Sequence, residues 1–136
     1  MVAALGAPGA APARAQDGGV IAATVTVSGL EARLIAPREV DAGRPFLALA
    51  LVRYAGPGAL EGVEASLAYN HTGMRSLGPA QRRLGTLHPG RWRWAVWALR
   101  AEAPGDYVLV AHVAGRDRLI GDRLEAESAA ALVRVR

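Results

Sequence analysis

The sequence predicts an all-β fold, an antiparallel β-sandwich of seven to eight strands, and three observations support this class. From Val20 onward, apolar residues alternate with a period of two rather than 3.6. Turn signals rich in Gly and Pro recur roughly every ten residues, as in sandwiches. The 136 residues include no cysteine, so a packed core rather than disulfide bonds is expected to hold the domain together.

Residues 1–19 (MVAALGAPGAAPARAQDGG) are predicted to be a leader and residues 20–136 to be the domain. Ala13-Arg14-Ala15 before Gln16 has the small-x-small pattern of a signal-peptidase site, although the preceding segment lacks a basic start and prolines interrupt its apolar run. Either a signal peptide begins upstream of Met1, or this segment is only a flexible leader. We favour export to the periplasm, the cell surface or the medium. No later run of about 18 apolar residues exists, so we expect no membrane span in the mature body.

Four strands are expected in the first half of the domain. Each has alternating or β-branched apolar residues and is bounded by a turn signal such as Ser28-Gly29, Pro37 or Asp41-Ala42-Gly43. The expected strands are Val20–Val27, Leu30–Ile35, Phe46–Tyr54 and Val63–Tyr69.

The second half is expected to continue the same pattern. Its strands are Arg82–Leu87, Arg91–Arg100 and Tyr107–Val113, the last ending in a turn at Gly115. Leu119–Val135 is expected to supply a last strand or a long hairpin. The Ala-rich segment Glu125–Val133 has helical propensity, but its ending favours a strand.

The turns also carry a family resemblance. Their patterns are Pro37-x-x-Val40-x-Ala42-Gly43-x-Pro45, Arg53-Tyr54-Ala55-Gly56, Gly85-x-Leu87-x-Pro89-Gly90 and Ala103-Pro104-Gly105-Asp106-Tyr107. Over about Leu30 to Val113 the chain resembles bacterial immunoglobulin-like domains of the CARDB type. It is also similar to sandwich domains appended to some glycoside hydrolases. The resemblance implies an immunoglobulin-like sandwich that serves as an adhesion module, spacer or accessory domain of an exported protein.

The chain departs from the family pattern in three ways. Tyr54 occupies the position where the family usually has the Asn of an Asn-x-Gly. The acidic residues typical of the family have no clear counterparts, which weakens an inference of ion or ligand binding. Only one copy of the domain is present, which weakens a spacer role in a long stalk.

The charge pattern argues against nucleic-acid binding. The chain has 16 basic residues, all of them Arg, and 12 acidic residues, for a net charge of +4. The arginines are scattered, and their closest groups are Arg82-Arg83, Arg91/Arg93 and Arg116/Arg118. A nucleic-acid site would gather them on one face. We therefore expect no nucleic-acid partner.

The motifs of common enzymes are absent from the sequence. It contains no Gly-rich phosphate loop, no HExxH and no GxSxG, so we predict that the protein is not an enzyme. One metal hypothesis concerns copper, which thioether and imidazole ligands suit. His71 and Met74 lie three residues apart in a loop, and His88 or His112 could complete the site. The alternative is an exposed loop histidine and a packed methionine.

The strand Arg91–Arg100 contains all three tryptophans. Trp92, Trp94 and Val96 share one face, while Arg91, Arg93, Trp97 and Leu99 share the other. Since only one face can point at the core, either Trp92 and Trp94 or Trp97 must lie outward or at an edge. One Trp could be the central core residue while the others cap the ends of the sandwich. Alternatively, a surface Trp–Arg patch binds a protein partner or a sugar ring.

Phe46–Tyr54 is apolar on both faces. The family spacing assigns Phe46, Ala48, Ala50 and Val52 to the core, which leaves Leu47, Leu49 and Leu51 pointing away from it. We therefore predict a non-catalytic, exported interaction module, a subunit or accessory domain of a surface or envelope assembly. The alternatives are a periplasmic copper-binding protein and a carbohydrate-contacting accessory domain. The predicted contact residues for a protein partner or a second copy are Leu47, Leu49, Leu51, Arg91, Trp92, Arg93, Trp94 and Trp97.

Overall fold

The computed structural model describes residues 20–27 and 29–136, and in this part the chain forms strands and turns. No helix here is long and apolar enough to cross a membrane. The predicted leader, residues 1–19, lies outside the described residues, so its role stays a prediction. The described residues form eleven strands, which are β2 (Val20–Val27), β3 (Leu30–Pro37), β4 (Glu39–Val40), β5 (Pro45–Tyr54), β6 (Leu60–Ala68), β7 (Met74–Ser76), β8 (Gln81–Leu87), β9 (Trp92–Ala101), β10 (Gly105–Asp117), β11 (Arg123–Glu127) and β12 (Ala131–Val135).

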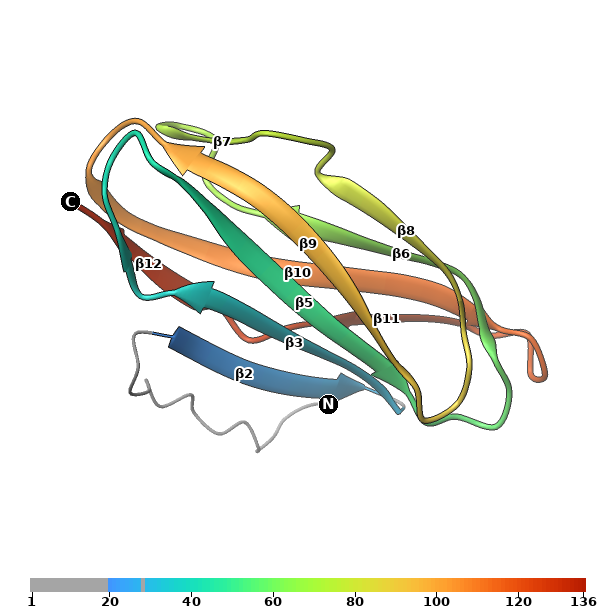
Figure 1. The fold of residues 1–136 in the computed structure, drawn as a ribbon. Coiled ribbons are helices and arrows are strands. Elements are labelled where there is room, and N and C mark those ends of the chain that lie inside the picture. Colours follow the sequence, from blue (N-terminus) through green and yellow to red (C-terminus); the bar gives the residue numbers. More distant parts are fainter. Residues whose placement is uncertain (1–19, 28) are drawn as a thin grey trace.

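The strands form two sheets that pack against each other (Figure 1). The first sheet has the order β2-β3-β5-β9-β7, and all its neighbours are antiparallel. The second has the order β4-β12-β10-β6-β8, with β11 also paired to β10. Its pairs are antiparallel except for the short contact of β12 with β4, which is parallel. The predicted class, an antiparallel β-sandwich, is confirmed.

The core lies between the sheets and follows the two-residue period of the strands. On β3, buried and half-buried residues alternate over all eight positions. On β5 the buried face runs from Phe46 through Ala48, Ala50 and Val52 to Tyr54, as predicted. On β9 the buried face contains Trp97, which is fully enclosed. Trp97 is therefore the core tryptophan of the sandwich.

The structure contains more strands than the predicted seven to eight. β4 and β7 are only two and three residues long, too short for a sequence period to reveal them. The tail forms two strands, β11 and β12, that pair with different parts of β10. Neighbouring strands, rather than local sequence, therefore determine these additional elements.

The turn predicted at Gly115 is wrong, because β10 continues to Asp117. Gly115 lies at a register shift between Ala114 and Arg116, where β10 pairs with β6. A Cβ atom at position 115 would lie 2.7 Å from Cγ of Leu60. The glycine thus allows a close approach between adjacent strands instead of forming a turn.

One edge of β10 is completed by three successive segments. β12 pairs with Gly105–Leu109, and β11 pairs with residues 112–116. Between them, Ser128 donates its N–H to the carbonyl of Ala111 (2.8 Å) and its Oγ accepts the N–H of Ala111 (2.9 Å). Ser128 therefore bridges the gap between the two strands that cover this edge.

Candidate functional site: an apolar face beside an open strand edge

The outer face of β5 and β9 carries a continuous apolar patch. Antiparallel pairing places Leu51 opposite Trp94 and Leu49 opposite Val96. Trp94 is 56% exposed and Leu47 is 54% exposed, while Leu49 and Leu51 are half-buried. We call this surface the Trp94 patch, and its members are Leu47, Leu49, Leu51, Trp94 and Val96. The structure thus places the predicted leucine stripe on the outside of the sandwich, beside a tryptophan.

Trp92 borders the patch but is engaged within the chain. The guanidinium groups of Arg53 and Arg33 lie 5.0 and 5.6 Å from the centre of its ring. Glu31 forms ion pairs with both arginines, at 3.2 Å from Arg53 and 3.8 Å from Arg33. Cation–π contacts of this kind stabilise a ring at a surface. Trp94 is therefore the more available of the two outer tryptophans.

The second feature of the site is the backbone of β9. β7 pairs only with Leu99–Ala101, and the N–H of Leu77 then donates to the carbonyl of Ala98 (2.8 Å). In a strand, the N–H and C=O of every second residue point to the same side. The backbone groups of Val96 and Trp94 therefore point to the same side as those of Ala98. Beyond Leu77, the part of the chain that the structure describes places no strand there.

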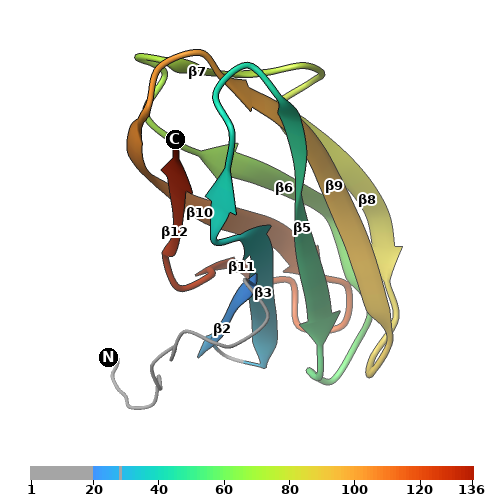
Figure 2. The ribbon, with the colours of Figure 1, turned by 60° about the vertical axis from the view of Figure 1, so that its left-hand side comes forward.

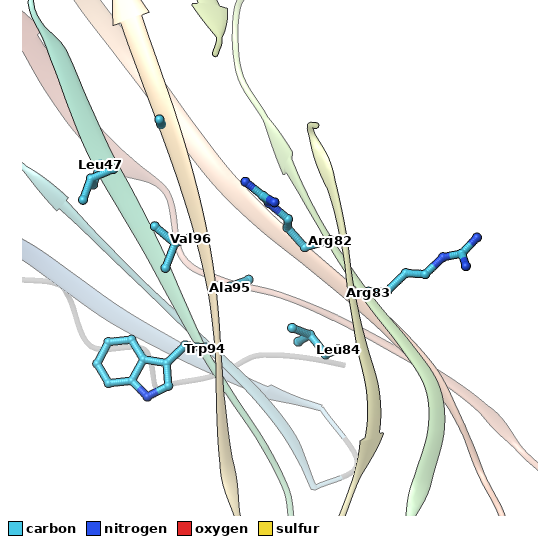
Figure 3. A pocket seen from close by; sticks show the side chains of 8 residues that line it. Leu47, Arg82, Arg83, Leu84, Trp94, Ala95 and Val96 are labelled. Atoms are coloured by element: carbon cyan, nitrogen blue, oxygen red, sulfur yellow. The ribbon is translucent and has the colours of Figure 1, made fainter. Parts of the chain in front are cut away.

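A groove runs between this edge of β9 and the strand β8 of the other sheet (Figure 3). Figure 2 shows β8 and β9 lying side by side. Two hydrogen bonds connect β9 to this part of the other sheet, from Trp97 Nε1 to the carbonyl of Ala80 just before β8 (2.9 Å) and from Arg93 to the carbonyl of Leu84 on β8 (3.2 Å). Figure 3 shows Arg82 and Leu84 extending from β8 toward β9, while Arg83 points away. The groove has a volume of about 350 Å³ and is lined by Leu47, Arg82, Arg83, Leu84, Trp94, Ala95, Val96 and Ala98.

The groove and its surroundings are basic. Arg82 has a buried Nε atom without a hydrogen-bond partner among the described residues. Arg83 has one loose ion pair, at 3.8 Å from Glu64. Arg93 donates to a neutral carbonyl rather than to a carboxylate. The apolar patch therefore adjoins a row of arginines with little compensating negative charge.

Three further residues of the predicted contact set, Arg91, Arg93 and Trp97, lie in different surroundings. Trp97 is fully buried in the core, so including it among surface contact residues was wrong. Arg93 connects β9 to β8 through its hydrogen bond to the carbonyl of Leu84. Arg91 is exposed in the turn that precedes β9.

The structure does not bring the four candidate copper ligands together. His71 follows β6 and stacks on Tyr69 (ring centroids 4.4 Å apart), while His88 follows β8 at the opposite end of the β6–β8 pair. Met74 is buried in the core. His112 lies midway along β10 and bonds Glu125 at 3.1 Å. No group of three or more His, Cys, Asp or Glu residues suited to a metal ion occurs among the described residues.

Sequence reasoning missed a buried polar pair at one end of the sandwich. Asp117 is fully buried and accepts hydrogen bonds from the Tyr54 hydroxyl and from the backbone N–H groups of Gly58 (3.3 Å), Leu119 (2.7 Å) and Ile120 (3.1 Å). The Tyr54 hydrogen bond and these N–H groups lower the pKa of Asp117, while burial and the carboxylate raise the pKa of Tyr54 to about 12. The only local signal was the Asx-type turn that begins at Asp117.

The Asp117 carboxylate is committed to structure. Its four donors tie the β5–β6 connection to the turn after β10. A Cβ atom at position 58 would lie 2.7 Å from Asp117 Oδ1, so Gly58 allows this approach. We therefore interpret Asp117 as a structural residue whose hydrogen bonds join two loops, rather than as a reacting group.

Comparisons with known proteins bear on the fold alone. No family model matches this chain, and no curated protein is significantly similar to it. Among solved structures, it is similar to the native conformation of E. coli alpha-2-macroglobulin, with a TM-score of 0.57 and 14% sequence identity. The match covers 86% of this chain but 8% of the macroglobulin, so this chain spans a small part of that protein's length. The likeness supports the β-sandwich, and the resemblance to CARDB-type domains stays a prediction.

Proposed function

We propose that this chain is a non-catalytic interaction module of an exported assembly and that it binds a protein partner through the Trp94 patch. The observation that carries the proposal is the exposure of more than half of Trp94 and Leu47 on one continuous apolar face. Soluble monomers rarely expose contiguous apolar surfaces of large size. Aromatic residues beside arginine are also typical of the energetic centres of interfaces.

The non-catalytic part of the proposal is supported by how the buried polar side chains are used. Asp117 and Ser128 are the buried polar residues of the described part of the chain. Asp117 accepts four hydrogen bonds, and Ser128 bridges β10 to the tail. The hydrogen bonds of both side chains therefore account for their burial without a catalytic role.

The alternatives have weaker support. A sugar ring could stack on Trp94, but the neighbouring Trp92 ring is already contacted by Arg33 and Arg53. A copper site would have to draw on His71, His88 and His112, which lie in separate parts of the sandwich. Protein binding remains the function that the exposed patch favours.

The proposal can be tested by position-specific photocrosslinking in the cell that makes the protein. A benzophenone amino acid replaces Trp94, and a matched variant carries it at Val108. Val108 is 49% exposed on the outer face of the second sheet, so it controls for nonspecific contact. We expect a discrete adduct from position 94 and none from position 108.

The mass of the adduct identifies the class of partner. A mass of twice the chain would show a second copy, and another discrete mass would show a different protein. Equal labelling from positions 94 and 108, or no adduct from position 94, would contradict the proposal. Light scattering of the purified Leu49→Asp variant tests self-association separately, because a charge within the patch should dissociate a homodimer.

A further inference from the structure

We propose that the partner contributes an extended acidic segment, which pairs as an added strand with the open edge of β9 along residues 92–97. This inference rests on the proposed function and specifies how the partner is held. Addition of a strand to an exposed sheet edge is a general mode of peptide recognition, in which backbone hydrogen bonds supply affinity and side-chain sites supply specificity.

The backbone of β9 supplies the first argument. The carbonyl of Ala98 already accepts the N–H of Leu77, so this side of β9 is suited to further pairing. The backbone groups of Val96 and Trp94 continue the same row without a strand opposite them in the described part of the chain. An added strand would therefore extend the short ladder that β7 begins.

The side chains on either side of this edge supply the second argument. Alternate residues of an added strand would point to opposite faces of the sheet. One row would lie over Trp94 and Val96, which are exposed and apolar. The other row would enter the groove toward Arg82 and Leu84 of β8 (Figure 3). The site therefore favours a segment in which apolar residues alternate with acidic ones.

Charge decides between this occupant and a second copy of the chain. Arg82 and Arg93 lie beside this edge, and no ion pair to a carboxylate is found for either in the described part of the chain, while Arg83 at the rim lies 3.8 Å from Glu64. Two copies joined through β9 would bring these arginines against their own equivalents, which costs free energy. A partner with carboxylates would instead give the guanidinium of Arg82, for which no ion pair is found in the described part of the chain, a charged acceptor.

A defined peptide tests this mode of binding on the purified chain. The probe is a seven-residue peptide, Val-Glu-Val-Glu-Val-Glu-Val, with blocked ends. One control replaces each Glu with Lys, and a second carries N-methyl groups on alternate residues, which removes the backbone donors. We expect saturable NMR shifts and slower amide exchange at Trp94 and Val96 with the first peptide only.

Two substitutions locate the binding site. Arg82→Gln should weaken binding of the acidic peptide about tenfold. Arg134→Gln on β12, three strands away from β8 in the same sheet, where Arg134 lies 3.4 Å from Asp106, should leave it unchanged. Val96→Pro should abolish binding while the sandwich still melts cooperatively, because the N–H of residue 96 faces the open edge. Should that variant fail to fold, the N-methylated peptide makes the same test.

Strand addition is overturned if the acidic peptide causes no saturable change at millimolar concentration, or if the Lys or N-methylated peptide binds equally well. In that case a crosslink from position 94 would leave the proposed function standing. Loss of both the peptide binding and the crosslink would contradict the proposed function as well.

Discussion

Strands β9 and β10 lie in different sheets, and their edges are completed to very different extents. β10 is paired with β6 on one side and with β12, Ser128 and β11 on the other. β9 is paired with β5 along its length, but on its other side β7 covers only Leu99–Ala101. Unpaired edge backbone is a template for another strand. The difference therefore indicates where a second chain can add to this sandwich.

The charged side chains near the two strands also differ in how far they are paired within the chain. On the outer face of the second sheet, Asp106 lies 3.4 Å from Arg134, and Glu125 bonds both His112 and Arg123. Beside β9, in contrast, Arg82 and Arg93 have no carboxylate partner in the described part of the chain. The closed edge adjoins charges that are neutralised within the chain, while the open edge adjoins charges available to a partner.

The largest predicted effect separates the two faces of β9. Trp97→Ala should destabilise the fold by about 3–5 kcal/mol, because it empties a fully buried site and removes the hydrogen bond to Ala80. Trp94→Ala should change the free energy of unfolding by less than about 0.5 kcal/mol, because its side chain is exposed. Urea denaturation of both variants measures the difference. Similar losses would mean that Trp94 packs within the chain and is not free for a partner.

The next effect concerns the hydrogen bond between Tyr54 and Asp117 at the end of the sandwich. Tyr54→Phe should cost on the order of 1–3 kcal/mol, because it leaves the buried Asp117 carboxylate without one of its donors. Tyr107→Phe is a matched control, since Tyr107 donates to the carbonyl of Ala103 near the surface and should cost less. An unchanged unfolding midpoint for Tyr54→Phe would show that the Tyr54–Asp117 hydrogen bond does not stabilise the fold.

The same pair predicts a pH dependence with opposite signs at the two extremes. The pKa of Asp117 is lower in the folded chain than its ordinary value of 3.8, so its contribution is complete above about pH 4 and is lost at lower pH. The pKa of Tyr54 is raised from 10.0 to about 12, so its contribution is complete below pH 10 and is lost as pH rises toward 12. Stability curves of Tyr54→Phe should lack the alkaline loss. An identical alkaline loss in the variant would assign it to other groups.

A smaller effect tests how the closed edge of β10 is held. Ser128→Ala should destabilise the fold by about 1–2 kcal/mol, because the buried N–H of Ala111 loses its acceptor. Ser66→Ala, at a half-buried position on the outer face of β6, should change stability by less than about 0.5 kcal/mol. Thermal unfolding compares the two variants. Equal unfolding midpoints for the two variants would show that Ser128 does not stabilise the closed edge of β10.

Much of the fold follows from alternation in the sequence. The period of two predicted the longer strands, and the spacing of the family that the chain resembles correctly assigned the Phe46 face of β5 to the core. It also showed that the tryptophans must divide between two faces, although not which face is buried. That choice depends on the residues packed opposite β9, such as Ala80 in the connection between β7 and β8, whose carbonyl accepts the Trp97 hydrogen bond.

The parts that the sequence could not predict depend on partners distant in the chain. Asp117 and Tyr54 are 63 residues apart, and each alone resembles an ordinary turn or strand residue. The open edge of β9 is visible only once β7 is known to be three residues long. The spread of the three histidines likewise follows from strand order rather than from their spacing.

The most direct test of the central claim is amide hydrogen exchange along β9, measured for the purified chain and for the assembly isolated from the producing cell. We predict fast exchange at Trp94 and Val96 in the purified chain and strong protection at both in the assembly, with Ala111 protected in each. Protection of Trp94 and Val96 already in the purified chain, or fast exchange that persists in the assembly, would contradict the claim that the open edge of β9 is where the partner binds.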